Sequence, residues 1–141
     1  MKYVLDSSVA FKWVVPEALS DKAIQLRDQF RQGIYEFLAP DVFPVEIGHA
    51  LTRAERQGRV SPVDGFVLWT AIMAECPKLF PSVSLMPRAY AISSQSRTGV
   101  YDCLYLALAE RENCELITAD QRLVSIVQPR FSRIVSLASV P

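Results

Sequence analysis

The sequence predicts an α/β fold in which a mostly parallel sheet is covered by helices on both faces. Short apolar runs alternate with longer segments of helical periodicity along the whole chain. Hydrophobic residues make up 50% of the sequence, so a sizeable core can be buried. The length of 141 residues fits one domain, residues 1–141, and leaves no room for two.

The amino-terminal half is predicted to contain two strands and three helices. The first strand ends at an acid, Asp6, and Asp41 is expected to cap the second helix. Gly33 and Gly58 each end a helix. The expected strands are Tyr3–Leu5 and Tyr35–Leu38, and the expected helices are Ser20–Gln32, Asp41–Gln57 and Ser61–Glu75.

Strands and helices also alternate in the carboxy-terminal half. Pro87 is expected to end a third strand and to start a helix, since proline is favoured in the first helical turn. Gly99 breaks the chain before the next helix. The expected strands are Val83–Met86, Glu115–Thr118 and Arg133–Leu137, and the expected helices are Pro87–Ser96, Tyr101–Glu112 and Asp120–Val127.

Composition narrows the class of protein. The formal net charge is zero, so any contact with nucleic acid is expected to be local rather than spread over a basic surface. Cys76, Cys103 and Cys114 form no C-x-x-C pair, which argues against a zinc site or a disulfide framework. No apolar run is long enough to span a membrane, and no signal peptide is recognisable, so we expect a cytoplasmic protein without a membrane partner.

Two acids follow predicted strands. Asp6 comes directly after the first strand, and Asp120 lies two residues after the strand that ends at Thr118. Ligands of such sheets bind outside the carboxyl ends of the strands, so both carboxylates are candidates for a functional site. Aspartate is also a common helix cap, and for each residue alone this second interpretation stays open.

Two further acids lie in apolar helices. Asp102 is the only charged residue in the segment TGVYDCLYLALA, so its carboxylate is expected in a poorly solvated place where a metal would compensate its charge. The alternative is a first-turn acid that interacts with the helix dipole. Glu46 lies between Val42 and Ala50, neither of which can pair with it, although a solvated helix face is equally compatible with this pattern.

Four carboxylates without a cysteine or histidine cluster favour Mg²⁺ or Mn²⁺ over zinc. Such ions can activate water and offset charge on a phosphate. A haloacid-dehalogenase-like phosphatase would need a second acid where Ser8 stands, and a receiver domain would need a lysine after the last strand, whereas no lysine follows Lys78.

Four segments together resemble PIN-domain ribonucleases, in particular the VapC toxins of toxin–antitoxin pairs. The start VLDSSVAFKW resembles their opening strand with its acid, VFPVEIGHAL the helix with the second acid, TGVYDCLYLALAE the third-acid segment, and LITADQRL the fourth. The segments occur in the family's order and cover nearly the whole chain.

The resemblance implies a three-layer α/β/α sandwich, a homodimer, cleavage of RNA that depends on Mg²⁺ or Mn²⁺, and inhibition by a cognate antitoxin. It makes Asp6, Glu46, Asp102 and Asp120 the catalytic, metal-binding acids. Ser8 and Thr118 would be hydroxyls that orient the carboxylates or metal-bound water. An inert PIN-like module that only binds RNA or protein is the alternative.

Other residues are weaker candidates. His49 and Arg53 share the helix side of Glu46, and Arg97 precedes the third-acid segment, so each is a possible RNA contact. For His49 an ordinary surface position is the favoured interpretation. An antitoxin would lie in an apolar groove, which is expected to begin at Phe11, Trp13 and Val14 unless these side chains belong to the core.

Overall fold

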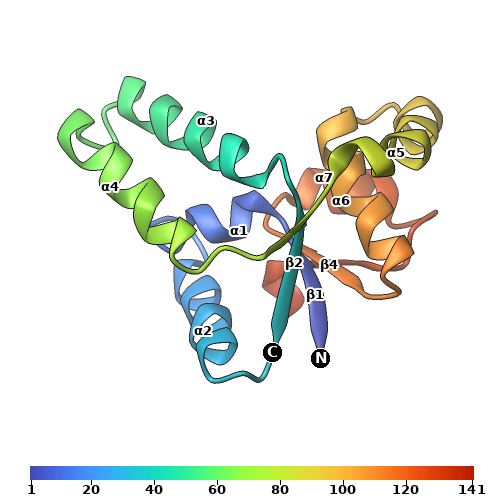
Figure 1. Cartoon of the computed structure of the whole chain (residues 1–141), viewed down its shortest axis with the longest axis horizontal. Helices are drawn as coiled ribbons and strands as arrows, with labels where there is room; N and C mark the ends of the chain where they lie inside the picture. Colours follow the sequence, from blue (N-terminus) through green and yellow to red (C-terminus); the bar gives the residue numbers. More distant parts are fainter.

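The computed structural model describes all residues, 1–141, and contains a five-stranded sheet with helices on both sides (Figure 1). The sheet order is β3-β2-β1-β4-β5, and each neighbouring pair is parallel. The strands are β1 (Lys2–Leu5), β2 (Glu36–Pro40), β3 (Lys78–Phe80), β4 (Glu115–Thr118) and β5 (Ile134–Ser136). The α/β class with a parallel sheet is thus confirmed.

Seven α-helices and one 3₁₀ helix connect or follow the strands. The chain winds from β1 to β3 in one direction along the sheet and then returns past β1 to β4 and β5. Because such crossovers are right-handed, α1–α4 lie on one face and α5–α7 on the other (Figure 1). The helices are α1 (Ser7–Phe11), α2 (Ser20–Arg31), α3 (Phe43–Arg56), α4 (Pro62–Met73), α5 (Ser82–Ser96), α6 (Val100–Arg111) and α7 (Gln121–Val127), with η1 at Leu137–Ser139.

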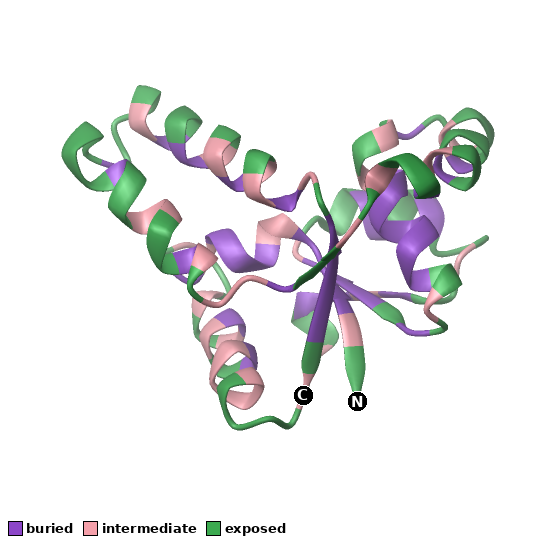
Figure 2. Ribbon diagram, in the orientation of Figure 1, coloured by how far each residue is buried: buried purple, intermediate pink, exposed green.

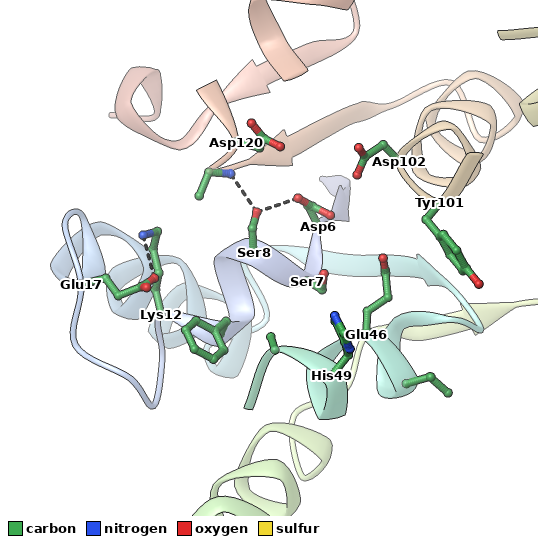
Figure 3. A pocket seen from close by; sticks show the side chains of 14 residues that line it. Asp6, Ser7, Ser8, Lys12, Glu17, Glu46, His49, Tyr101, Asp102 and Asp120 are labelled. Carbon is green, nitrogen blue, oxygen red and sulfur yellow. Dashed lines mark hydrogen bonds and ion pairs between the residues drawn. The ribbon is translucent and has the colours of Figure 1, made fainter. Parts of the chain in front are cut away.

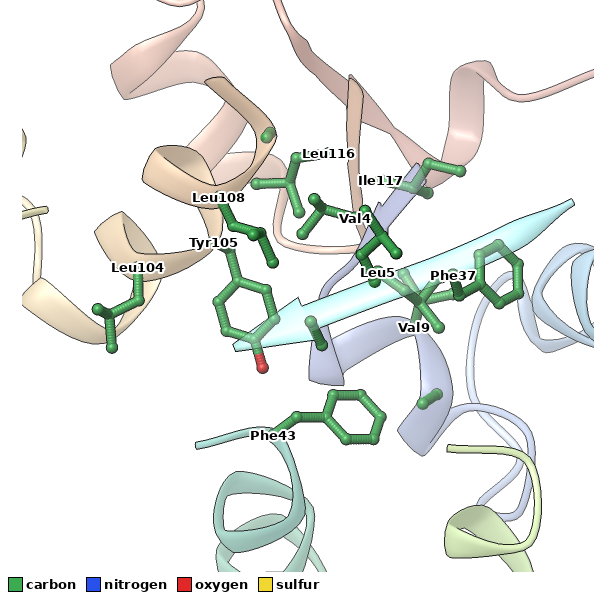
Figure 4. Close-up of a cluster of buried hydrophobic side chains, with 14 of the residues drawn as sticks. Val4, Leu5, Val9, Phe37, Phe43, Leu104, Tyr105, Leu108, Leu116 and Ile117 are labelled. Carbon is green, nitrogen blue, oxygen red and sulfur yellow. The ribbon is translucent and has the colours of Figure 1, made fainter. Parts of the chain in front are cut away.

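The core fills both faces of the central strands (Figure 4). Val4 and Leu5 of β1 are fully buried, and Leu116 and Ile117 of β4 lie beside them at 0% and 1% exposure. Strands covered on both faces read as continuous apolar runs, which is why the sequence signals them clearly. On α6, every residue from 103 to 109 is buried, as the apolar segment around Asp102 predicts (Figure 2).

The amino-terminal helix α1 was not expected from the sequence. It has only five residues, too few to display helical periodicity. The helix starts directly after β1, and Asp6 occupies its N-cap position without making a side-chain capping bond. The sharp transition from strand to helix therefore places Asp6 at the carboxyl end of the sheet.

The expected strand Val83–Met86 is wrong, because these residues belong to the first turns of α5. The third strand lies earlier, at Lys78–Phe80. The buried positions of α5, namely Leu85, Ala89 and Ile92, are spaced by four and three residues, which is a helical period. Pro87 therefore lies inside the helix and does not begin it.

Asp41 does not cap α3, contrary to expectation. The helix begins at Phe43, and its N-cap residue Val42 makes no side-chain bond. The Asp41 carboxylate instead accepts a hydrogen bond from the backbone N–H of Ser82 at 3.1 Å, at the start of α5. It thus connects the carboxyl end of β2 with the helix that follows β3.

Helices α3 and α4 form a hairpin that extends away from the sheet (Figure 1). Trp69 joins them, because its indole N–H donates to the Pro44 carbonyl at 2.9 Å. Val63, Phe66 and Val67 of α4 are 83%, 72% and 64% exposed. None of the helices combines the length and apolar character that a membrane span requires.

Candidate active site

Four acidic side chains meet at the carboxyl edge of the sheet, in a cavity of about 710 Å³ (Figure 3). We call it the acidic cavity, and the four carboxylates that meet there are those of Asp6, Glu46, Asp102 and Asp120. They come from the end of β1, the first turn of α3, the first turn of α6 and the end of β4. The strand order reverses between β1 and β4, which is where open α/β sheets form their ligand crevice.

Asp6 is the most deeply buried of the four. The residue is 6% exposed, and its carboxylate oxygen Oδ2 accepts hydrogen bonds from Ser8 at 2.6 Å and from Thr118 at 2.8 Å. Burial raises the pKa of Asp6, the two hydroxyls lower it, and the nearby charge of Asp120 raises it again. The two hydroxyls therefore hold one oxygen of Asp6 and stabilise its charged form.

Ser8 and Thr118 also order the chain after β4. The Ser8 hydroxyl accepts a hydrogen bond from the backbone N–H of Ala119 at 3.1 Å, and the Thr118 hydroxyl accepts one from the N–H of Asp120 at 3.1 Å. The same two side chains thus contact Asp6 and fix the backbone that carries Asp120.

Glu46 is held by a tyrosine from the opposite face of the sheet. The Tyr105 hydroxyl donates to Oε1 of Glu46 at 2.6 Å, and Tyr105 itself is only 1% exposed. The pKa of Glu46 is raised to about 7, chiefly by burial and also by the charges of Asp6 and Asp102, while the hydrogen bond from Tyr105 lowers it. Glu46 is thus a partly buried carboxyl whose protonation changes near neutral pH.

Asp102 lies one helical turn before Tyr105 on α6 and makes no hydrogen bond through its side chain. Its pKa is raised to about 6, chiefly by burial and also by the charges of Asp6 and Asp120. The mutual repulsion shows that these carboxylates are close enough to oppose each other's ionisation.

Asp120 has a capping role as well as a place in the cavity. Its Oδ1 accepts a hydrogen bond from the backbone N–H of Leu123 at 3.1 Å, at the start of α7. The helix-cap interpretation therefore applies to Asp120 and not to Asp6. Since a carboxylate has two oxygens, capping leaves the second one free to take part in the site.

The donor set fits a hard divalent cation. The cavity gathers carboxylate oxygens, which Mg²⁺ and Mn²⁺ prefer, and burial together with the neighbouring carboxylates raises the pKa values of Glu46 and Asp102. No three histidine, cysteine, aspartate or glutamate side chains are grouped as ligands of one ion. The carboxylates therefore line the cavity without forming a closed coordination shell.

The three possible RNA contacts expected from the sequence lie in different parts of the structure. His49 lines the acidic cavity, where it lies beside Glu46 (Figure 3). Arg53 is exposed and lies outside the cavity. Arg97 lines a second, smaller cavity that borders the first.

Several residues of this region were missed by sequence reasoning. Tyr101, Lys12 and Glu17 line the acidic cavity, and the Lys12 ammonium pairs with Glu17 at 3.1 Å. The signal for Tyr105 in the sequence is its place three residues after Asp102, on the same side of one helix.

The groove expected at Phe11, Trp13 and Val14 is mostly core. Phe11 and Trp13 are 7% and 6% exposed, and the Trp13 indole donates to the carbonyl of Ala23 at 3.0 Å. Of the three, only Phe11 lines the acidic cavity.

Comparison with known proteins places this geometry in a family. The profile of the PIN domain family matches residues 3–128. Ribonuclease VapC1 of Mycobacterium tuberculosis is 32% identical over 126 residues, which cover 86% of this chain and 91% of that protein. Ribonuclease VapC3 of Pyrobaculum aerophilum is 28% identical over 127 residues, or 87% of this chain and 92% of that protein.

Solved structures share the fold at lower sequence identity. PAE2754 from Pyrobaculum aerophilum superimposes with a TM-score of 0.72 at 19% identity, over 99% of this chain and 85% of that chain. The VapBC2 complex from Rickettsia felis, bound to a DNA fragment from its promoter, gives a TM-score of 0.66 at 11% identity, over 96% and 97%. Since the family profile and a relative of 32% identity both span most of its length, the chain belongs to the PIN domain family and, within it, to the VapC proteins.

Proposed function

We propose that the chain is a metal-dependent endoribonuclease and the toxin of a toxin–antitoxin pair. The observation that carries this proposal is the convergence of four carboxylates in one cavity at the strand-order reversal of a PIN domain. The curated relatives that it resembles over most of its length are named ribonucleases, which makes RNA the expected substrate. Single-stranded or looped RNA would give the scissile phosphate the access that this cavity requires.

Asp6, Glu46, Asp102 and Asp120 are the residues that would hold Mg²⁺ or Mn²⁺. When bound, the ion would supply an activated water and offset the charge that develops on the phosphate. Ser8 and Thr118 keep one oxygen of Asp6 fixed. Tyr105 does the same for Glu46, so the carboxylates would be oriented before the ion and the RNA arrive.

The test of catalysis is the variant Asp6→Asn. Asparagine keeps the shape of the side chain and an oxygen that can accept from Ser8 and Thr118, but it removes one negative charge. We expect the variant to fold normally, by circular dichroism and thermal unfolding, and to lose cleavage of single-stranded RNA in Mn²⁺ or Mg²⁺. Wild-type rates in the highly purified variant would contradict the assignment and favour an inert binding module.

An antitoxin partner is the second part of the proposal. The VapBC2 complex is a structural neighbour, although at an identity that shows only the shared fold. The exposed apolar side chains Val63, Phe66 and Val67 of α4 are a surface that a partner or a second copy of the chain would bury. We expect a homodimer that acts in the cytoplasm.

Growth of a bacterial host tests the toxin role. Expression of the chain alone should arrest growth, expression of D6N should not, and co-expression of the product of the neighbouring gene should restore growth. Normal growth at high levels of wild-type protein that binds Mn²⁺ and cleaves RNA in vitro would refute the toxin role and leave the nuclease assignment intact.

A further inference from the structure

A second cavity of about 240 Å³ borders the acidic cavity and has two lining residues in common with it. Asp102 and Asp120 line both cavities. We call the second one the arginine cavity, and its other lining residues are Arg97, Thr98, Gly99, Arg122, Leu123 and Ile126. Whatever occupies it would therefore lie directly beside the four carboxylates.

The two arginines of this cavity have no partner within the protein. Neither the Arg97 nor the Arg122 side chain makes a hydrogen bond or an ion pair, whereas the Arg88 side chain is paired with Glu110 through two hydrogen bonds, at 2.8 and 3.0 Å. The two arginines come from different elements, the end of α5 and the first turn of α7, and they reach the same small space.

Both arginines occupy positions that cost folding free energy. Arg97 has φ 54°, in the left-handed region that residues with a side chain avoid. Arg122 places a cation in the first turn of a helix, where the helix dipole favours an anion. Both arginines are exposed, so their charged ends are free to bind a ligand.

Neutral donors complete the wall of the cavity. Thr98 is 9% exposed, and its hydroxyl is buried without a hydrogen-bond partner. Helix α6 begins at Val100, and its N-cap residue Gly99 has no side chain to cap it, so the first backbone N–H groups of the helix are also free at this rim. Arginine forks, a hydroxyl and free N–H groups at a helix start are the donors that bind a phosphate.

We propose that the arginine cavity binds the RNA phosphate next to the one that is cut, with Arg97 and Arg122 as its charged contacts. The inference rests on the proposed ribonuclease function, because Asp102 and Asp120 repel a phosphate unless a cation compensates them in the acidic cavity. With that cation bound, the two arginines are the uncompensated charges of the arginine cavity. They fix the register of the RNA backbone and read no base.

The experiment measures RNA binding apart from cleavage. In the D6N background, which should not cleave RNA, the affinity for a short oligouridylate is determined by fluorescence anisotropy at several salt concentrations. Mn²⁺ is kept high enough to saturate the acidic cavity, because the loss of the Asp6 charge weakens cation binding. We expect R97Q and R122Q each to weaken binding about tenfold, as for the loss of one charged hydrogen bond. Each should also reduce the slope of log K against log salt by about 0.7, the contribution of one phosphate contact on a single strand.

Two control variants separate the effect of the arginine charge from the effect of its position in the cavity. R122K keeps the charge and should retain the salt slope while losing the bidentate geometry. Arg133 is also exposed and unpaired, but it precedes β5 and so lies at the opposite edge of the parallel sheet, and R133Q should leave affinity and slope unchanged. In the otherwise wild-type enzyme, R122Q should raise KM about tenfold with little change in kcat.

The two proposals can fail separately. If the wild-type protein cleaves RNA and R97Q and R122Q behave like R133Q in affinity, salt slope and KM, the phosphate site is refuted while the ribonuclease function stands. If the protein cleaves no RNA but binds the oligouridylate through both arginines, the ribonuclease proposal is refuted and the phosphate site stands. A loss of folding in R97Q, detected by thermal unfolding, would leave R122Q and R122K to decide.

Discussion

Single side chains define the site more closely than the four acids alone suggest. Asp6 and Glu46 are the carboxylates with hydroxyl donors, from Ser8 and Thr118 in one case and from Tyr105 in the other. A buried carboxylate with fixed partners loses less conformational freedom when it binds an ion than one that moves freely. The hydroxyls therefore prepare the site for a cation before one is present.

We expect Tyr105→Phe to weaken Mn²⁺ binding 10- to 100-fold, the usual effect of removing the partner of a metal ligand. Phenylalanine fills the same space, so the fold should persist while Glu46 loses its donor at 2.6 Å. Mn²⁺ titration followed by electron paramagnetic resonance measures the affinity, and kcat at saturating Mn²⁺ should stay near the wild-type value. Tyr90→Phe is the matched control, since Tyr90 is 68% exposed on α5 and lines neither cavity. Equal affinities in the two variants would show that Tyr105 has no positioning role.

At the scale of elements, α5 shows how a proline can mislead sequence analysis. Pro87 is in the sixth position of α5, where it removes one backbone hydrogen bond of the helix. Pro62, in contrast, is the first residue of α4, a position in which the missing N–H costs nothing. Both side chains are exposed, so the two prolines differ mainly in their place within a helix.

Pro87→Ala should raise the free energy of unfolding by about 2 kcal/mol. An interior proline costs about 3 kcal/mol relative to alanine, and the greater freedom of the unfolded alanine chain offsets up to about 1 kcal/mol. Pro62→Ala changes the unfolded chain in the same way without the helical gain, so it should lower stability slightly. Urea unfolding of both variants checks the difference, and equal effects would contradict this account of α5.

The same comparison explains which elements could be predicted. The buried strands β1 and β4 and the helices α3 and α6 carry strong apolar patterns, and they lie within two residues of their expected bounds. The elements α1 and β3 have five and three residues, too few for a pattern, and β3 lies between prolines with two exposed side chains. Strand ends and one buried helix indicated Asp6, Asp120 and Asp102, whereas Glu46 was indicated only by the resemblance of its segment to the VapC toxins. The contact from Tyr105 to Glu46 joins two helices and needs the tertiary structure.

At the scale of the whole molecule, the fold brings four negatively charged side chains together at the point where the strand order reverses. Residues from four elements meet at one edge of the sheet although Asp6 and Asp120 are far apart in sequence. The charged forms of these carboxyls are unfavourable in the folded protein, because burial and mutual repulsion raise the pKa of Asp102 to about 6 and that of Glu46 to about 7. Stability and cation binding are therefore linked through the protons that these carboxyls carry.

The stability of the ion-free protein should consequently fall as pH rises from about 4 to about 7. The ordinary pKa values, 3.8 for Asp102 and 4.5 for Glu46, apply to the unfolded chain, so within this window the folded state binds more protons. Stability then decreases with pH and levels off above the folded pKa values. Urea unfolding in EDTA measures this decrease, and rising stability over the same window would contradict it.

Glu46→Gln should remove part of this pH dependence, because the amide accepts the Tyr105 hydrogen bond but carries no charge. At a pH of about 8 we expect the ion-free variant to be more stable than the wild type by roughly 1–3 kcal/mol, the free energy of a shift of this size. Glu36→Gln, at an exposed glutamate without partners on β2, should have little effect. Added Mn²⁺ should reverse the order, since the cation stabilises the wild type by binding its carboxylates and binds the site of the variant only weakly. If Mn²⁺ raised the melting temperature of both proteins equally at every pH, the cation would not depend on Glu46, and the site would have to be built from the other three acids.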